Sequence, residues 1–484
     1  MTKVQVFFTA LILLCSQTSK GQYFLYSYSI NDWQWVWGLE EQNSSYYTIG
    51  TNYKDYYSLD LIKFDGNGDT TFWKRFKQPN YVGPCRSGPV GTDSTTILLP
   101  YTNVVVAGTE LYPMILLTNE LGDSISSFNA FGSKQGQIFW GIKNGNQNAF
   151  IGYEKDSATG ERTACILITN NLGQTMAYST WPYFTYETQG IAIDTTIDNG
   201  YVATISYITG DLSIPVAVKF DSMGNYQWHQ ELCYGLHTGV IYPECLTDGN
   251  IIFTGYIDLD NFASLVNSNR YVAKTTNSGL LVWENDFGMV GSGSYLADAF
   301  VNAQQLSSGN LIVLGSQVDT TDSLSKVWLS LMDTAGTVIW DRNYLPCSQP
   351  LAFPEVLLSS DKSSLLVTGY TSPCPGTDYE FFALKVDTFG CIIPGCSIGI
   401  EESFIEASSA IVFPNPSNSS LTIQFANSVV GKIFLSNSHG ELILTKNLKS
   451  ENQKTLDLGL YPKGVYLLSV LTLAEKFSFK IVIH

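Results

Sequence analysis

Apolar and polar residues alternate in short runs along most of the chain, and pairs of these runs are joined by turn residues. The run VAVKF at residues 216–220 leads into Asp221, and Gly224 precedes a second run, YQWHQEL. Alternation with a period of two is typical of β-strands. An aspartate side chain closes such a turn on its own backbone, and glycine adopts the positive φ that the turn needs. We therefore predict a tight hairpin around residues 221–224.

The hairpin pattern occurs seven times, and consecutive copies are 51 to 57 residues apart. Upstream of each copy a second hairpin is indicated, for example by DNGYVATISY at residues 198–207. Each repeat therefore predicts four short antiparallel strands, such as GIAIDTT, YVATISY, PVAVKFD and YQWHQEL in the fourth repeat. The turn glycines are Gly68, Gly122, Gly173, Gly224, Gly279, Gly336 and Gly390.

This repeat predicts an all-β fold with a seven-bladed β-propeller at residues 22–396. A repeated four-strand unit is typical of propeller blades, whereas the 3.6-residue period of a helical solenoid is absent from the sequence. Trp228, which follows the fourth turn, is expected to pack between neighbouring blades.

The seventh repeat lacks a recognisable outermost strand. After Gly390 the sequence continues CIIPGC, and Pro394 stands where other repeats carry an aromatic residue. A proline has no N–H to donate to a strand ladder. The segment YFLYSYS at residues 23–29 alternates like a strand and has no partner in the first repeat. We predict that it supplies the outermost strand of the seventh blade and closes the ring.

Composition and charge agree with a β-rich protein and exclude two partner classes. Only 14% of the residues are charged, 13% are aromatic, and the formal net charge is −17. Aromatic residues favour strands, and Asn, Ser and Gly favour turns. Because a nucleic-acid backbone or an anionic membrane surface would repel this negative charge, we expect neither as a partner.

The N-terminus predicts a secretory signal peptide at residues 1–21. Lys3 is followed by an apolar run at residues 4–14 and by small residues at Ser19 and Gly21, which suit signal peptidase. A lipoprotein signal at Cys15 is less favoured because the bulky Leu14 precedes it. No later apolar run approaches the ~20 residues that span a bilayer. We therefore expect an exported protein without a transmembrane segment.

Eight of the nine cysteines lie after Cys15. An even number in an oxidising compartment permits disulfides. Close spacing suggests the pairs Cys233 with Cys245, Cys347 with Cys374, and Cys391 with Cys396, although other pairings stay open. Cys165 lies in the strand-like run ACILITN and is expected to be a buried thiol.

The repeat stops after Cys396. Residues 397–409 form an acidic, small-residue stretch that predicts a linker. Residues 410–484 carry short alternating runs between Pro, Asn and Gly turns. This pattern predicts a small Ig-like β-sandwich.

The C-terminal segment resembles a known family through four motifs in a fixed order. These are Pro414-Asn415-Pro416 after an apolar pair, Asn437 with Gly440 between two strands, Leu460, Gly464 and Tyr466 in LYPKGVYLL, and Lys480-Ile481-Val482 near the end. The segment is similar to the type A C-terminal sorting domain of type IX secretion system cargo of Bacteroidota. An accessory β-sandwich without a sorting role is the alternative.

The resemblance implies an export route. The cargo would fold in the periplasm and pass the outer membrane through the type IX translocon. A sortase-like peptidase would then cleave near the linker, and the product would be released or attached to surface lipopolysaccharide. The implied location is the outer cell surface or the medium.

Two enzyme families share superficial features with the repeats. The sialidase Asp-box also combines Asp, Gly and Trp, but it places one residue between Asp and Gly where Asp221 and Gly224 are separated by two. The quinoprotein docking motif resembles TTNSGLLVW, yet the adjacent cysteines of those dehydrogenases are missing and Trp283 needs only a packing role. We interpret the turns as structural.

The sequence indicates no metal and no cofactor. Asp65, Asn67 and Asp69 alternate like calcium ligands, but the chain has Phe76 where such a loop ends in glutamate, so we predict the first hairpin there. The chain has four histidines and lacks HExxH, GxSxG and P-loop motifs.

Aromatic residues in the predicted loops are the binding candidates. Loops at residues 181–190, 233–245 and 316–326 should emerge on one face of the propeller, and exposed aromatic rings there suit glycan or protein ligands. For each ring, packing on a neighbouring blade is the alternative. We expect a noncatalytic binding or structural protein. The alternative is a secreted propeller enzyme acting on polysaccharide. Carboxylates that converge at the mouth of the ring would favour the enzyme. The candidates are Tyr183, Phe184, Tyr186, His237 and Tyr242.

Overall fold

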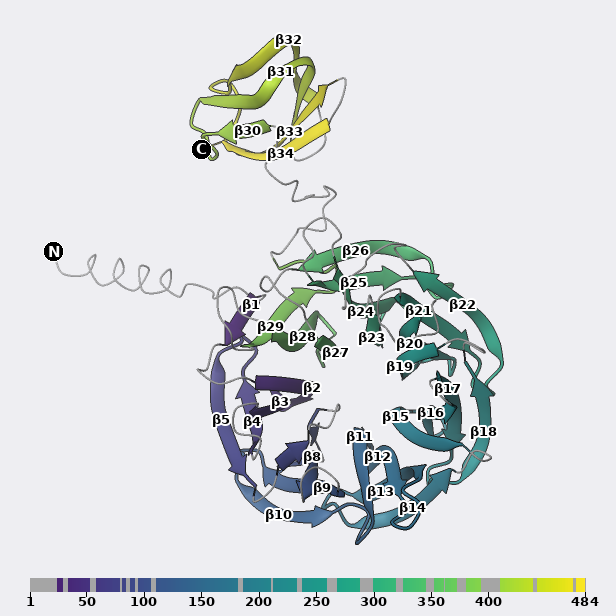
Figure 1. The fold of residues 1–484 in the computed structure, drawn as a ribbon. Helices are drawn as coiled ribbons and strands as arrows, with labels where there is room; N and C mark the ends of the chain where they lie inside the picture. The colour runs from purple at the N-terminus through teal and green to yellow at the C-terminus, as the bar shows by residue number, and fades with distance from the viewer. Residues whose placement is uncertain are drawn as a thin grey trace, which may run out of the picture. The chain divides into compact units, whose positions relative to one another are not determined.

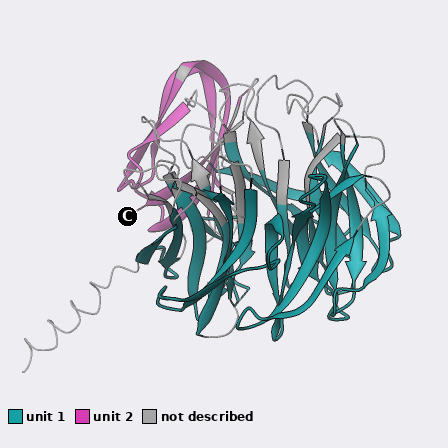
Figure 2. Cartoon of the chain, turned by 60° about the horizontal axis from the view of Figure 1, so that its bottom comes forward, with its two compact units in different colours: residues 1–395 teal, residues 396–484 magenta. Residues whose placement is uncertain are grey.

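The computed structural model describes the strands and most hairpins of the chain. The chain consists of two compact units, residues 1–395 and 396–484, which Figure 2 colours separately. The predicted signal peptide (1–21) and linker (397–409) lie outside the described residues. The described residues are 24–28, 34–52, 58–78, 81–83, 88–91, 95–105, 110–181, 186–209, 212–232, 237–258, 268–287, 299–318, 325–344, 352–360, 362–371, 380–392, 410–437, 442–472 and 476–483.

Unit 1 contains seven antiparallel sheets among its described residues, and they follow one another in chain order. We call them sheets 1 to 7. Sheets 1 to 4 consist of β2 (Gln34–Gln42), β3 (Ser45–Asn52), β4 (Ser58–Phe64) and β5 (Thr70–Lys77); β6 (Tyr81–Gly83), β7 (Val90–Gly91), β8 (Thr96–Val105), β9 (Glu110–Asn119) and β10 (Ser124–Asn129); β11 (Gln135–Asn144), β12 (Gln147–Lys155), β13 (Arg162–Asn170) and β14 (Thr175–Trp181); and β15 (Glu187–Thr195), β16 (Tyr201–Thr209), β17 (Leu212–Phe220) and β18 (Tyr226–Glu231).

Sheets 5 to 7 repeat the four-strand arrangement. They consist of β19 (His237–Cys245), β20 (Ile251–Asp258), β21 (Ser268–Thr275) and β22 (Leu281–Phe287); β23 (Ala299–Gln305), β24 (Leu311–Val318), β25 (Ser325–Met332) and β26 (Val338–Tyr344); and β27 (Ala352–Leu358), β28 (Ser364–Thr371), β29 (Glu380–Asp387) and β1 (Phe24–Tyr28). The sheets surround a common centre, with the first strand of each sheet inside and the last outside, so the fold is all-β and propeller-like (Figure 1).

Strand β1 joins the beginning of the chain to the last sheet. It pairs antiparallel with β29, in a register that places Phe24 opposite Lys385 and Tyr28 opposite Phe381. The prediction that residues near the N-terminus supply the outermost strand of the seventh repeat is therefore confirmed. Because β1 covers the edge of β29, that row of N–H and C=O groups is paired.

The seven turn glycines have the predicted geometry, with φ between 73° and 84°. In the fourth repeat, the Gly224 N–H donates to the Asp221 carbonyl at 3.0 Å. The Asp221 Oδ1 accepts from the backbone N–H groups of Met223 and Asn225, both at 2.8 Å. Asp65 accepts in the same way from Asn67 and Asp69, so the calcium-like sequence is the first hairpin, as predicted.

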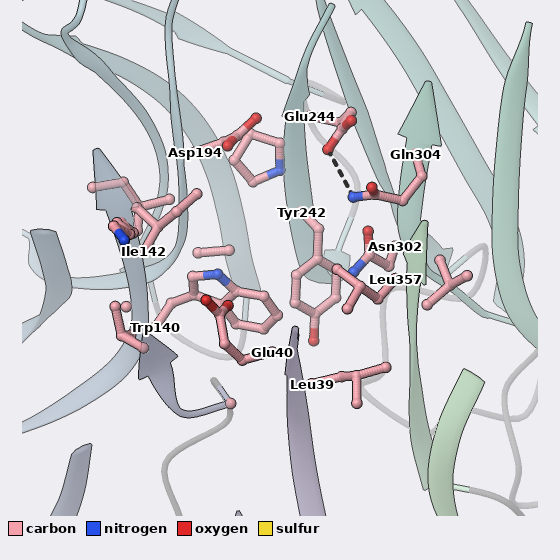
Figure 3. Close-up of a pocket in the computed structure, with 18 of the residues that line it drawn as sticks. Leu39, Glu40, Trp140, Ile142, Asp194, Tyr242, Glu244, Asn302, Gln304 and Leu357 are labelled. Carbon is pink, nitrogen blue, oxygen red and sulfur yellow. Dashed lines mark hydrogen bonds between the residues drawn. The ribbon is translucent and has the colours of Figure 1, made fainter. Parts of the chain in front are cut away.

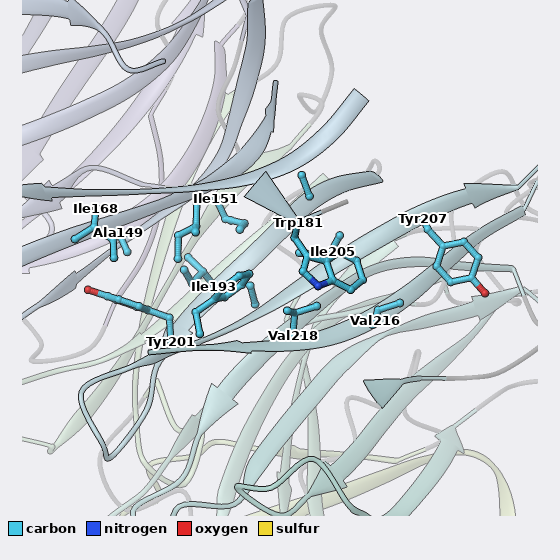
Figure 4. Packing of buried hydrophobic residues seen from close by; sticks show 14 of the residues in the cluster. Ala149, Ile151, Ile168, Trp181, Ile193, Tyr201, Ile205, Tyr207, Val216 and Val218 are labelled. Carbon is cyan, nitrogen blue, oxygen red and sulfur yellow. The ribbon is translucent and has the colours of Figure 1, made fainter. Parts of the chain in front are cut away.

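Neighbouring sheets are held together by apolar cores and by rings seated on turn glycines. Figure 4 shows the cluster between sheets 3 and 4, in which Ile151 and Ile168 pack with Ile193 and Val218. A Cβ added at Gly279 would lie 2.7 Å from the Trp228 ring, whose Nε1 donates to the Asn277 carbonyl at 3.2 Å. The predicted packing of Trp228 between sheets is confirmed.

The described cysteines correct one predicted disulfide. Cys245 is a free thiol, so the predicted pair with Cys233 is wrong. Its backbone N–H donates to Asp194 of sheet 4 at 2.6 Å, because Cys245 ends an inner strand instead of lying in a loop. Cys165 is free and buried, as predicted, and burial raises the pKa of its thiol.

The other two predicted pairs lie largely beyond the described residues. Cys391 is disulfide-bonded. Its predicted partner Cys396, together with Cys347, Cys374 and Cys233, lies outside the described residues. These pairings therefore stay predictions.

The described residues of unit 2 form five antiparallel strands. β31 (Ser420–Asn437) pairs with β30 (Ala410–Phe413), with β32 (Leu442–Asp457) and with β33 (Gly464–Thr472), and β34 (Lys476–Ile483) lies beside β33. The core of the unit contains Leu421, Ile433, Leu468 and Ile481. The predicted division into two Ig-like sheets stays a prediction.

The motif residues of unit 2 tie its first turn to its last strand. The Asn415 Nδ2 donates to the Lys480 carbonyl at 2.6 Å, and the Asn415 Oδ1 accepts from the Val482 N–H at 2.9 Å. Tyr466 is buried, and its hydroxyl donates to the Pro462 carbonyl at 2.6 Å. Gly440 lies outside the described residues. Two motifs that are 65 residues apart in sequence are thus joined by one side chain.

We expect Gly279→Ala to lower the free energy of unfolding by more than Gly309→Ala does. Both glycines have a positive φ, 84° and 88°, so each substitution carries a backbone penalty of about 1–3 kcal/mol. At Gly279 the new methyl also clashes with Trp228, whereas no atom lies within 4 Å at Gly309. Urea unfolding of the two variants measures the difference. Equal losses would mean that the Trp228 contact does not couple the sheets.

We expect Asn415→Ala to speed amide hydrogen exchange in β34, since it removes two hydrogen bonds worth about 1 kcal/mol each. Asn415→Asp is the matched control, because its carboxylate still accepts from Val482 but no longer donates to Lys480. The Asp variant should therefore show the smaller increase, and unchanged exchange in both variants would contradict the role given to Asn415.

Candidate functional site

A cavity of about 150 Å³ lies where the inner strands of the seven sheets meet. We call it the central pocket. Each sheet of unit 1 contributes residues to it (Figure 3). The principal lining residues are Leu39, Glu40, Val90, Trp140, Ile142, Lys143, Ala192, Asp194, Tyr242, Glu244, Asn302, Gln304 and Leu357.

β-Bulges on the inner strands position part of this lining. The register of five inner strands shifts directly before a pocket residue. A bulge bends its strand and redirects the side chains beside it. The repeated scaffold therefore presents a different side chain at one equivalent position in each of these sheets, namely Glu40, Trp140, Ala192, Tyr242 and Asn302.

Two aromatic rings meet in the pocket. Trp140 of β11 and Tyr242 of β19 have ring centroids 5.1 Å apart and an angle of 59° between their planes. They come from sheets 3 and 5, and they pack together with Ala192 of sheet 4. Tyr242 is 5% exposed, whereas Trp140 is partly exposed and can offer ring surface to a ligand.

Two carboxyl groups in the pocket bridge neighbouring sheets. The Asp194 oxygens accept from the N–H groups of Thr195 (2.7 Å) and Cys245 (2.6 Å). The Glu244 oxygens accept from the Gln305 N–H and the Gln304 Nε2, both at 3.4 Å. Burial raises the pKa of Asp194 to about 6, even though its hydrogen bonds lower it. Burial and then the charge of Asp194 raise the pKa of Glu244.

Glu40 is the third carboxyl group of the pocket. Burial raises its pKa to about 7, while a hydrogen bond from the Gly91 backbone and the charge of Lys143 lower it. A Cβ at Gly91 would lie 2.7 Å from the Glu40 Oε1, so the Glu40 carboxyl group lies close to the backbone of sheet 2. Lys143 is exposed, and it is the cationic residue among those that line the pocket.

The structure describes three of the five predicted binding residues, Tyr186, His237 and Tyr242. Tyr242 lies in β19 and lines the central pocket, so placing it in a loop was wrong: residues 237–245 pair with β20 and form the inner strand of sheet 5 despite a bulge between Gly239 and Tyr242. His237 begins the same strand. Tyr186 is 44% exposed and stacks on Tyr207, with ring centroids 5.4 Å apart. Tyr183 and Phe184 lie outside the described residues.

Most of the residues that line the pocket were not among the predicted binding residues. Glu40, Trp140, Asp194 and Glu244 each lie in an ordinary strand run, and their convergence depends on which positions of seven separate repeats face the centre. The available signal was a carboxylate or large ring in the second half of the first strand of sheets 1, 3, 4 and 5. Without the bulge positions, that signal does not distinguish the pocket from the packing between sheets.

The other chemical alternatives of the sequence have structural explanations. The Trp283 Nε1 donates to the Thr334 carbonyl of sheet 6 at 3.2 Å, which is the inter-sheet packing role predicted for it. No cluster of three or more His, Cys, Asp or Glu that could hold a metal ion occurs in the part of the chain that the structure describes. Among the same residues, no helix is long and apolar enough to cross a membrane.

Comparison with known proteins identifies the C-terminal segment. Residues 411–484 match the family model of the secretion system C-terminal sorting domain. No curated protein matches the chain.

Solved structures with a similar arrangement share little sequence with this chain. A protein of unknown function from Dyadobacter fermentans is 10% identical, with a TM-score of 0.47 and coverage of 75% of this chain and 97% of that one. The β-propeller domain of the Trilobed protease from Pyrococcus furiosus is 9% identical, with a TM-score of 0.40 and coverage of 73% and 95%. Polysaccharide lyase Uly1 is 7% identical, with a TM-score of 0.47 and coverage of 72% and 89%.

We expect Glu40→Gln to stabilise unit 1 more at pH 8 than at pH 5. A carboxyl group whose pKa is about 7 when folded holds its proton more tightly than in the unfolded chain, so it costs stability as the pH rises from about 4.5 to 7. The glutamine variant avoids this cost, which is at most about 3 kcal/mol. Thermal unfolding at both pH values measures it, with Glu161→Gln at an exposed hairpin as the control. A gain independent of pH would contradict the raised pKa.

Proposed function

We propose that this type IX secretion cargo, which carries its sorting domain at residues 411–484, acts outside the cell as a noncatalytic binding protein built on a seven-bladed β-propeller. The sorting domain places the protein at the cell surface or in the extracellular space. The function assigned to unit 1 rests on one observation: the inner strands of all seven described sheets converge on the central pocket, which combines aromatic rings with carboxyl and amide groups.

Seven blades are supported by the count of sheets and by the way the chain closes. Unit 1 has seven sheets among its described residues, and β1 completes the last of them. A closed ring buries both faces of each sheet and gives a rigid frame, on which ligand sites commonly lie near the centre or on the connecting loops.

Binding without turnover is supported by the hydrogen bonds of the pocket carboxyl groups. Both oxygens of Asp194 accept from backbone N–H groups, and both oxygens of Glu244 accept from residues of sheet 6. Groups that bridge adjacent sheets in this way are fixed by the scaffold. A general acid or base instead needs its oxygen within reach of a substrate proton.

A secreted enzyme that acts on polysaccharide is the second candidate. The raised pKa values of Asp194 and Glu244 favour it, because catalytic acids are commonly tuned by burial and by a neighbouring like charge. The small volume of the pocket counts against it, since drug-sized ligands already need cavities of about 300 Å³ or more.

The sorting domain also points to partners in the export step. We propose that the type IX translocon recognises unit 2 and that a sortase-like peptidase cleaves in the segment 397–409, before the product is released or attached to surface lipopolysaccharide. Leu460 of the motif LYPKGVYLL is 92% exposed, so its side chain is available for contact with the translocon. The motif residues Pro414, Asn415, Pro416, Gly440, Gly464, Tyr466 and Lys480 are proposed as the sorting-domain positions.

The protein without its signal peptide can be screened against small metabolites, glycans and host proteins, with ligand binding followed by saturation-transfer NMR and ligand depletion followed in the same samples. We expect saturable binding without depletion, weakened about tenfold or more by Asn302→Leu in the pocket and unchanged by Tyr186→Phe. Depletion of a glycan would establish the enzyme instead. Binding that survives Asn302→Leu and is lost in Tyr186→Ala would move the site to the predicted loop face.

A further inference from the structure

We propose that the central pocket binds a small organic cation of the alkylammonium class, held in the corner formed by the rings of Trp140 and Tyr242, with the Glu40 carboxylate as its counter-ion. This inference rests on the proposed binding function and names the ligand class for it. It combines three observations: the size of the cavity, the rings that line it and the imbalance of charge around it (Figure 3).

The size of the pocket limits the ligand to a few heavy atoms. A cavity of about 150 Å³ accommodates a molecule about as large as benzene. A methylated ammonium group falls within this limit, whereas an oligosaccharide does not. The ligand can be either a free small amine or the tip of a longer molecule whose remainder lies outside the pocket.

The rings offer the surface that such a cation prefers. An ammonium group over the face of a tryptophan or tyrosine ring is attracted by the negative charge of that face, and the attraction strengthens when water is excluded. Trp140 and Tyr242 meet at 59°, so they form two walls of a corner and do not cover each other completely. Apolar residues of sheets 2 and 7, Val90 and Leu357, enclose the same space.

The charged groups around the pocket leave negative charge in excess. Glu40, Asp194 and Glu244 line it, Glu41 lies beside Glu40, and Lys143 is the cationic lining residue. Glu41 is engaged by Ser360 of sheet 7, and Lys143 is exposed to solvent. Buried carboxylates are either paired with a cation or neutralised by a proton. A bound cation would supply the missing partner.

Binding should therefore be linked to proton release. In the empty pocket burial holds the pKa of Glu40 at about 7, so the group is partly protonated near neutral pH. A cation beside the carboxyl group favours its ionised form. The affinity for a cation should increase as the pH rises through this range, and a proton should leave the protein when the cation binds.

The test compares three probes of nearly the same shape and different charge: tetramethylammonium, tert-butanol and pivalate. Their binding to the protein without its signal peptide is measured by isothermal titration calorimetry. We expect saturable binding of tetramethylammonium and at least about tenfold weaker binding of the neutral and anionic probes. Equal binding of all three, or none of tetramethylammonium, would overturn the proposal.

Proton release is measured on the unmodified protein by repeating the titration in buffers with different ionisation enthalpies. We expect release that is larger near pH 6.5 than at pH 8.5, where Glu40 is already ionised. A cation that binds with no release at either pH would refute the role of Glu40. This measurement needs no variant, so it stands even where a substitution in the pocket prevents folding.

Two substitutions test which residues supply the charge that the bound cation senses. Glu40→Gln should weaken tetramethylammonium binding at pH 8 about tenfold or more and remove most of the proton release, whereas Lys143→Met should strengthen binding. Glu161→Gln on an exposed hairpin is the control for a general loss of negative charge and should match the unmodified protein. An equal loss in Glu40→Gln and Glu161→Gln would indicate nonspecific attraction and overturn the proposal.

Failure of this inference and failure of the proposed function are distinguishable. A neutral ligand that binds in the pocket and is lost in Asn302→Leu would refute the cation while leaving the binding function intact. Turnover of a glycan would refute the binding function, whichever probe enters the pocket.

Discussion

The contact between an outer-strand aromatic ring of one sheet and the turn glycine of the next is the constraint on which unit 1 depends. A Cβ at the turn glycine would lie 2.4 Å from Phe128 at Gly173, 2.7 Å from Trp228 at Gly279 and 3.0 Å from Trp283 at Gly336. Each ring therefore needs both the positive φ and the missing side chain of that glycine. The contact recurs at these three junctions, where it holds the outer strand of one sheet against the hairpin of the next.

Because the scaffold is repeated, the inner strands bring side chains from distant parts of the chain to one place. Glu40 and Tyr242 follow bulges in β2 and β19 and line the same cavity. The same convergence explains the buried acids. Asp194 and Glu244 accept hydrogen bonds from backbone N–H groups of the next sheet and so join neighbouring inner strands. The burial that comes with this position raises the pKa of both carboxyl groups.

The local elements could be predicted from the sequence because their determinants are local. The hairpin at Gly224 follows from Asp221 and the glycine alone, and the unusual strand β1 follows from a proline at position 394 and an unpaired alternating run at 23–29. The C-terminal sorting domain was recognisable from four ordered motifs. The disulfide between Cys233 and Cys245 was predicted wrongly because it was inferred from closeness in sequence alone, whereas Cys245 ends the extended strand β19 and is a free thiol.

The sequence by itself thus determined the strand periods, the repeat, the manner of closure and the export signal, since each can be read from the pattern of short runs of residues. Only the tertiary structure decided which side chains meet in the central pocket. Trp140 and Tyr242 lie in different repeats, and whether their rings meet depends on the bulge before each residue and on the ring of sheets that brings sheet 3 near sheet 5. Such contacts arise from the summed twist and packing of the sheets, which no short segment of sequence encodes.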